Sequence, residues 1–93
     1  MRDITWDDFA GAVGTGYSVT ADGNEFDLTL EQASEVPSAG RVGGSFRLEF
    51  VGPQVPVLPQ AIYPFRHGDE AFEIFIVPIS SNREGTRYEA IFY

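Results

Sequence analysis

Residues 22–31 read DGNEFDLTLE, and this stretch decides the fold class. Residues 22–24 (Asp-Gly-Asn) are a tight-turn signal of the kind that joins two hairpin strands. After the turn, Phe26, Leu28 and Leu30 alternate with polar residues, which is the period of a strand with one buried and one solvent-facing side. The stretch therefore predicts a turn followed by a half-buried β-strand.

The same period of two continues on both sides of this stretch. It predicts strands over residues 15–20, 45–51, 61–66, 72–79 and 86–93. Their expected inward rows are Tyr17 and Val19; Phe46, Leu48 and Phe50; Phe72, Ile74 and Ile76; and Tyr88, Ala90 and Phe92.

Helical spacing is confined to the N-terminus. Thr5 is a good N-cap and Asp8 occupies a capping-box position, so we expect a helix of two or three turns. Gly11 and Gly14 limit its length. Its expected apolar face consists of Trp6, Phe9, Ala10 and Val13.

The remaining segments are predicted to be loops and turns. Residues 33–44 are rich in Ser, Gly, Ala and Pro, and residues 67–70 and 80–85 are polar turns. The proline-rich segment 52–59 should be extended but outside any ladder, because proline has no backbone donor. For the same reason Pro64 should mark an edge or a bulge.

A single domain over residues 1–93 follows from the length. An open sheet would leave exposed edges, and closure into a barrel removes them. The expected fold is therefore mainly β: a compact antiparallel β-barrel or roll of about six strands, with the short helix plugging or flanking one end.

The charge excludes several functions. Fourteen acids, six arginines and no lysine give a net charge of −8, which disfavours nucleic acid and anionic membranes. No apolar run approaches the roughly 20 residues of a membrane span, and residues 1–8 lack the apolar core of a signal peptide. We expect synthesis in the cytoplasm without a classical export signal. The absence of lysine has two explanations, codon bias or a surface rich in contacts.

A catalytic or metal-binding constellation is not evident, and we expect no enzyme and no cofactor. His67, with Asp69 and Ser80 or Ser81, lacks a nucleophile elbow, and a turn histidine explains it better. Without cysteine there is no thiolate zinc site. Residues 22–25 lack the spacing of a calcium loop.

The acids of the strand after residue 24 invite a structural interpretation. Glu25, Asp27 and Glu31 share one face and would repel one another if they were buried. We expect them to be solvated or paired with Arg47 or Arg87 across the sheet.

Two features point to binding. Strand 72–79 is apolar on both faces, and Phe75 and Val77 on its second face can be extended by Ile91 and Tyr93. This strand is expected to be buried on both sides, under the chain's own helix, under its proline-rich loop or under a partner protein.

The second feature is the stiff segment 55–60. It supplies Val55, Val57 and Leu58, which can dock on the chain's own barrel or on a neighbour. These seven residues form the predicted interface.

Five motifs carry a resemblance to a known family. They are residues 6–9 (Trp-Asp-Asp-Phe) with Val13-Gly14 and Tyr17, residues 46–53 (FRLEFVGP), residues 58–63 (LPQAIY), residues 75–78 (FIVP) and residues 88–92 (YEAIF). In this order they resemble a small bacterial domain family of unknown function, from which the chain departs at Ala61, where glycine is expected. Members are often encoded beside phage-tail-collar-like or fibre-type proteins. The resemblance implies a part in a virion or surface assembly and no catalytic residue.

Two hypotheses about function remain. The first is a non-catalytic structural or adaptor protein in a phage-tail-, fibre- or pilus-like assembly, with itself or a fibre- or tail-collar-like protein as partner. The alternative is a small binding module with a ligand or peptide at the barrel mouth, lined by Tyr17, Tyr63 and Phe65.

Overall fold

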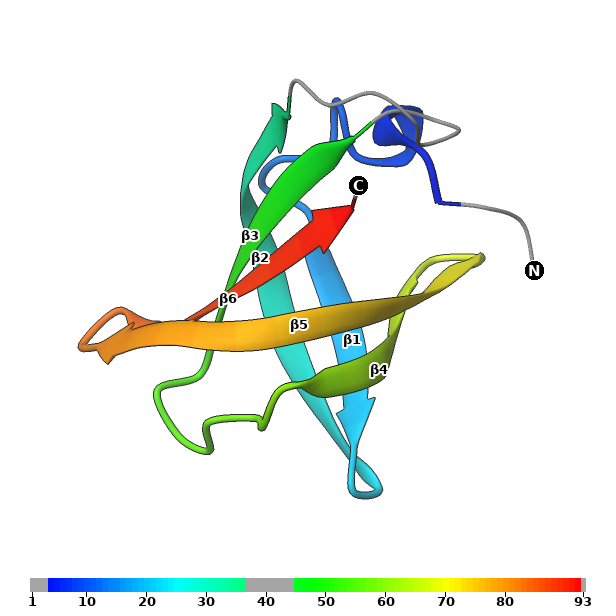
Figure 1. Ribbon diagram of the computed structural model, residues 1–93. Coiled ribbons are helices and arrows are strands. Elements are labelled where there is room, and N and C mark those ends of the chain that lie inside the picture. The colour runs from blue at the N-terminus through cyan, green and yellow to red at the C-terminus, as the bar shows by residue number, and fades with distance from the viewer. Residues whose placement is uncertain (1–3, 37–44, 93) are drawn as a thin grey trace.

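Six antiparallel strands close into a barrel in the computed structural model, which describes residues 4–36 and 45–92 (Figure 1). Round the barrel the strands follow the order β1-β2-β3-β6-β5-β4, and β4 closes the ring against β1. The elements are the 3-10 turn η1 (Trp6–Asp8), β1 (Gly16–Ala21), β2 (Asn24–Glu35), β3 (Phe46–Gly52), β4 (Ala61–His67), β5 (Glu70–Asn82) and β6 (Gly85–Phe92). The predicted fold class, an antiparallel barrel of about six strands, is confirmed. The predicted interface residue Tyr93 and most of the predicted loop 33–44 lie outside the described residues.

The β1–β2 hairpin forms where the turn signal predicted it. Asp22 and Gly23 both have positive φ, at 51° and 78°, and Ala21 and Asn24 are register partners on either side. Two left-handed residues give a turn whose twist matches that of the flanking strands, and Asp-Gly is a sequence that tolerates this conformation. The local sequence therefore sets the register of this hairpin.

Strands β2 and β5 are both longer than predicted. β2 runs to Glu35, so the predicted loop cannot begin at residue 33, and β5 runs to Asn82, which leaves only residues 83–84 for the turn before β6. Each strand contains a register shift, in β2 between Leu30 and Gln32 and in β5 between Pro78 and Ser80. A bulge adds a residue without ending the ladder, so these polar ends still pair through their backbones.

The predicted N-terminal helix is wrong in length. It is a single 3-10 turn of three residues, although the Asp8 carboxylate does accept a hydrogen bond from the Thr5 backbone N–H (2.8 Å), as the capping box predicts. The chain continues from Phe9 in turns rather than in a regular helix. Gly14 then takes φ +96°, and its N–H donates to the carbonyl of Leu30, in the middle of β2, at 2.7 Å. Val13 stays exposed.

The ladder between β1 and β4 is short. It joins Ser18 to Arg66 and Val19 to Phe65, and it stops where β4 continues into Pro64. Proline cannot donate to the ladder, so the prediction that Pro64 marks an edge holds on the side of β4 that faces β1.

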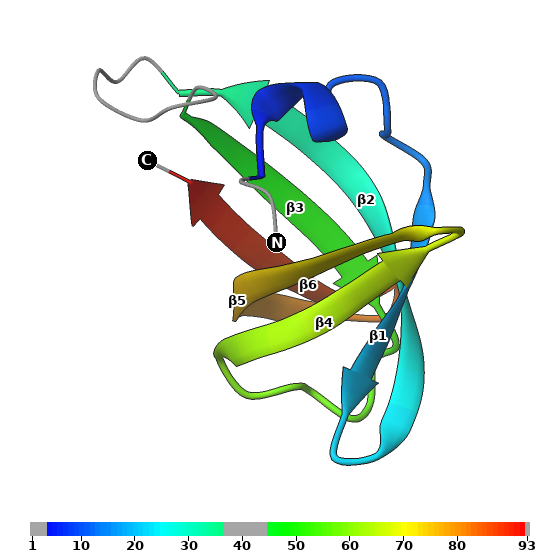
Figure 2. The same cartoon turned by 90° about the vertical axis from the view of Figure 1, so that its right-hand side faces the viewer.

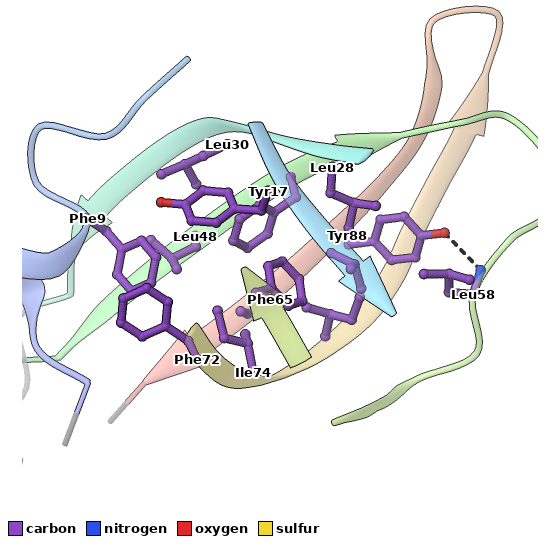
Figure 3. Packing of buried hydrophobic residues seen from close by; sticks show 14 of the residues in the cluster. Phe9, Tyr17, Leu28, Leu30, Leu48, Leu58, Phe65, Phe72, Ile74 and Tyr88 are labelled. Carbon is purple, nitrogen blue, oxygen red and sulfur yellow. Dashed lines mark hydrogen bonds between the residues drawn. The ribbon is translucent and has the colours of Figure 1, made fainter. Parts of the chain in front are cut away.

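The inward rows of all six strands meet in one core (Figure 3). The predicted rows are buried, except that Phe26 and Phe92 are only half-buried. The core also takes one residue from each of two irregular segments, Phe9 and Leu58, which lie at opposite ends of the barrel in Figure 3. Side chains therefore fill the interior from end to end.

Candidate functional site: the outer surface of the barrel

The outward side chains of the strands fall into regions of different chemistry. Strand β2 carries Glu25 and Asp27 on its outer side, and both are exposed. Four outward apolar side chains of β4, β5 and β6 form what we call the apolar sector: Ile62, Phe75, Val77 and Ile91. Ile79 of β5 is also exposed, but it lies in the bulge between Pro78 and Ser80. In the ring order β2 stands three strands from β5 in either direction, so the acidic and apolar sides lie across the barrel from each other.

Three members of the apolar sector are neighbours on β4 and β5, and Ile91 lies two residues from the β6 partner of Val77. Ile62 and Phe75 are register partners in the β4–β5 ladder, and Val77 is the partner of Glu89 on β6. Ile62 is 63% exposed, Phe75 49% and Ile91 40%, whereas Val77 is half-buried. These side chains offer a partner an apolar surface on a rigid sheet.

The expectation that the chain's own helix or proline-rich loop buries the second side of strand 72–79 is wrong, and burial under a partner protein stays a prediction. The strand's inward row of Phe72, Ile74 and Ile76 is buried, but the outward Phe75 is half exposed. Neither the η1 turn nor the proline-rich segment covers Phe75 in the described part of the chain, because both segments are used to close the barrel ends. The predicted contact residues of this strand are therefore accessible.

The proline-rich segment divides its three predicted contact residues. Val55 and Val57 are exposed, but Leu58 is only 5% exposed and belongs to the core. The backbone N–H of Leu58 donates to the Tyr88 hydroxyl at 2.8 Å, the dashed line in Figure 3. This hydrogen bond fixes the segment on its own barrel, so Leu58 cannot serve as a surface contact in the folded chain.

A ladder of ion pairs lies beside the apolar sector, on the outer side of β3 and β6. Arg87 contacts Glu31 at 3.1 Å and Glu49 at 3.0 Å, and Arg47 contacts Glu49 at 3.0 Å and also pairs with Glu89. The hydrogen bond to Glu89 raises the pKa of Arg47 above its ordinary value, against the opposing effect of burial. The prediction that acids of β2 pair with these arginines is confirmed for Glu31.

The Glu49 side chain is only 11% exposed, although it stands on the outer side of the sheet. Both arginines cover it, so each of its two carboxylate oxygens has a cationic partner. Removing either partner of such a shielded ion pair lowers the stability of the fold, because it leaves a charge without compensation away from water. The ladder thus joins two arginines to the three glutamates Glu31, Glu49 and Glu89 in a paired, charged surface next to the apolar sector.

His67 does not lie near Ser80 or Ser81, the serines that a Ser-His-Asp catalytic set would require. Its Nδ1 atom is 3.1 Å from the Gly16 carbonyl oxygen, and its ring centroid is 5.7 Å from that of Tyr17. Ser80 and Ser81 stand near the far end of β5, roughly 30 Å along the strand at about 3.3 Å per residue. The fold therefore separates the histidine from both hydroxyls.

Residues 4–92, which contain all six strands, match the family described as Domain of unknown function (DUF6916). The chain belongs to this family. A search of the curated proteins finds no match, and a search of the solved structures finds none. The resemblance to a small family of unknown function is confirmed, whereas its gene neighbourhood and its role in an assembly stay predictions.

The described residues of this DUF6916 domain show neither a pocket nor a metal-binding cluster. No pocket is found in residues 4–36 and 45–92, and no group of three or more His, Asp or Glu side chains there could hold a metal ion. None of the helical segments in that part of the chain is long and apolar enough to cross a membrane. The apolar sector is the surface feature on which a functional proposal can be built.

Ile62 is the member of the apolar sector that sequence reasoning missed. Its strand was predicted, but no outward row was assigned to it, because Pro64 interrupts the alternation. The available signal was Tyr63 and Phe65 on one side with Ile62 on the other, which is apolar on both faces like residues 72–79. Only the β4–β5 register shows that Ile62 lies beside Phe75.

Proposed function

We propose that this domain is a non-catalytic structural or adaptor protein that acts through protein–protein contacts, as a subunit or accessory of a larger assembly of the phage-tail, fibre or pilus kind. The observation that carries the proposal is the apolar sector. Scattered exposed apolar residues are ordinary, but a contiguous group on a rigid sheet is typical of a contact surface. Three of its four members are at least 40% exposed.

Rigidity supports the same proposal. The strands that carry the apolar sector are held by the β4–β5 ladder of seven register pairs and by a core that is filled from end to end. A surface that is already ordered loses little conformational entropy when a partner binds. The neighbouring ion-pair ladder would supply a polar rim of the kind that surrounds the apolar centre of many interfaces.

No observation favours the alternative of a ligand site at the barrel mouth. Tyr17 and Phe65, two of its three predicted lining residues, are packed in the core with their ring centroids 6.1 Å apart. Phe9 and Leu58 occupy the two ends of the interior. The hydroxyl of Tyr63, the third residue, donates to the Pro59 carbonyl.

Photo-cross-linking in cells of the source organism tests the proposal. Phe75 is replaced by the photoreactive p-benzoyl-phenylalanine, and the same residue is placed at Asp27 on the opposite side of the barrel as the matched control. We expect irradiation to give a discrete adduct from position 75 and none from position 27. No adduct from position 75, or equal adducts from both positions, would contradict a contact role for the apolar sector.

A further inference from the structure

We infer that the apolar sector is covered by a second copy of this chain, in a two-fold symmetric dimer centred on Phe75. This inference rests on the proposed function and names the partner for its contact surface. It follows from the shape of the sector, its area and the distribution of charge round the barrel.

Phe75 lies at the centre of the apolar residues of β4 and β5. Phe75 has Ile62 as its register partner on β4 and lies two residues from Val77 on the same face of β5, so apolar neighbours flank it along and across the strands. A symmetric dimer brings the same patch of both copies together, and the residue nearest the axis meets its own counterpart. Phe75 is the largest side chain of the sector, and paired aromatic rings give a favourable centre for such a contact.

Area comes second. The exposed fractions of the sector correspond to roughly 300 Å² of apolar surface, taking about 150–250 Å² for a fully exposed large side chain. A standard interface buries about 800 Å² on each partner, of which a little over half is apolar. The sector thus supplies most of the apolar part, and the polar side chains around it supply the rest.

Charge decides between a second copy and a basic partner. The outward residues of β4 and β5 outside the sector include one base, Arg66, and one acid, Glu73. These two stand on the same face, since Glu73 is the register partner of Pro64 and Arg66 that of Ala71. The outward side of β6 is balanced in the same way by Arg87 and Glu89. A balanced rim suits a copy of itself, whereas a basic partner would require surplus acid there.

The net charge of −8 does not oppose this arrangement. Glu25 and Asp27 lie on β2, across the barrel from β5, so two copies joined through β5 keep these acids at the far ends of the dimer. Even the shortest dimension of one chain is 22 Å. The Debye length at physiological ionic strength is about 8 Å, so repulsion between these distant acids is screened.

Sedimentation analysis of the purified chain, from about 1 µM to 1 mM, tests the inference over the range expected of a small interface. We expect a concentration-dependent monomer–dimer equilibrium. Phe75→Glu should weaken dimerisation at least tenfold, because it places a charge at the centre of the contact. Asn24→Asp adds the same single charge at the tip of the β1–β2 hairpin and should leave the equilibrium unchanged.

The outcomes that overturn the inference are distinct. A chain that stays monomeric up to 1 mM, or one whose dimer responds equally to Phe75→Glu and Asn24→Asp, is not joined through this surface. Ile62→Asn provides a second variant at the edge of the sector, and thermal unfolding of each variant shows that it is folded. If Phe75→Glu does not fold, a dimer that resists Ile62→Asn overturns the inference.

Failure of this inference can be told from failure of the proposed function. A monomeric purified chain together with a heterologous adduct from position 75 in cells means that the sector binds another protein, so only the dimer is wrong. A monomeric chain with no adduct in cells contradicts both. An adduct of two 10.3 kDa chains in cells, with a dimer in solution, supports both.

Discussion

Strands β2 and β5 build the core in the same way and differ on their outer sides. They are the two longest strands, of 12 and 13 residues, each has one bulge, and they stand across the barrel from each other (Figures 1 and 2). Inward, β2 contributes Leu28 and Leu30, and β5 contributes Ile74 and Ile76, all fully buried. Outward, β2 is acidic and β5 is apolar. The inward rows of both strands are apolar because they build the core, whereas the outward rows are not constrained by the core and can differ in chemistry.

The largest expected effect tests the equivalence of the inward rows. Leu28→Ala and Ile74→Ala should each lower the free energy of unfolding by about 2–5 kcal/mol, because each removes a fully buried side chain and leaves a cavity. Denaturant-induced unfolding measures both. A small loss at only one of the two sites would break the equivalence of the strands.

An intermediate effect is expected in the ion-pair ladder that separates the two sides. Glu49→Gln should cost about 1–3 kcal/mol of unfolding free energy, because this nearly buried carboxylate is held by two arginines. Glu31→Gln is the matched control, since its side chain is 44% exposed and a surface pair contributes only about 0–1 kcal/mol. Thermal or denaturant unfolding measures both variants, and equal losses of unfolding free energy would show that the burial of Glu49 does not strengthen its ion pairs.

The smallest effect on stability is expected at the outward positions themselves. Asp27→Ser should change the unfolding free energy of the monomer by about 0.5 kcal/mol or less, because its side chain is exposed. Phe75→Ser should lower it by about 1–2 kcal/mol, because half of the Phe75 side chain is buried against the sheet. Their effects on solubility should be opposite, since the first removes apolar surface and the second removes charge. Precipitation by ammonium sulfate measures this, and a shift in the same direction for both would contradict the contrast between the strands.

Alternation in the sequence predicted the inward rows well, because facing is a local property of a strand. The Asp22-Gly23 turn was equally local, since a two-residue left-handed turn needs only its own residues. The ends of β2 and β5 were not predictable in this way. Their final residues are polar and were taken for loops, yet they pair across a bulge with strands that lie elsewhere in the chain.

The apolar sector was predicted only in part. Phe75, Val77 and Ile91 were recognised because an apolar second face stands out in a strand, and all three belong to the sector. Ile62 and Leu58 were misjudged for opposite reasons. Ile62 gains its apolar neighbour from a register partner in the next strand. Leu58 is buried in the core, where its backbone N–H donates to the hydroxyl of Tyr88, 30 positions away.

The sequence by itself determined that the chain forms an antiparallel β-barrel with aromatic and aliphatic rows inside and most of its charge outside. Period and turn chemistry act over a few residues, so they can be followed along the chain without knowing its partners. Only the tertiary structure decided that the N-terminal helix is a single 3-10 turn and that Gly14 and Thr15 pair with Leu30 of β2. It also decided that Leu58 belongs inside and that four apolar side chains from three strands form one outer surface. Those outcomes depend on contacts between distant residues, which alternation alone does not encode.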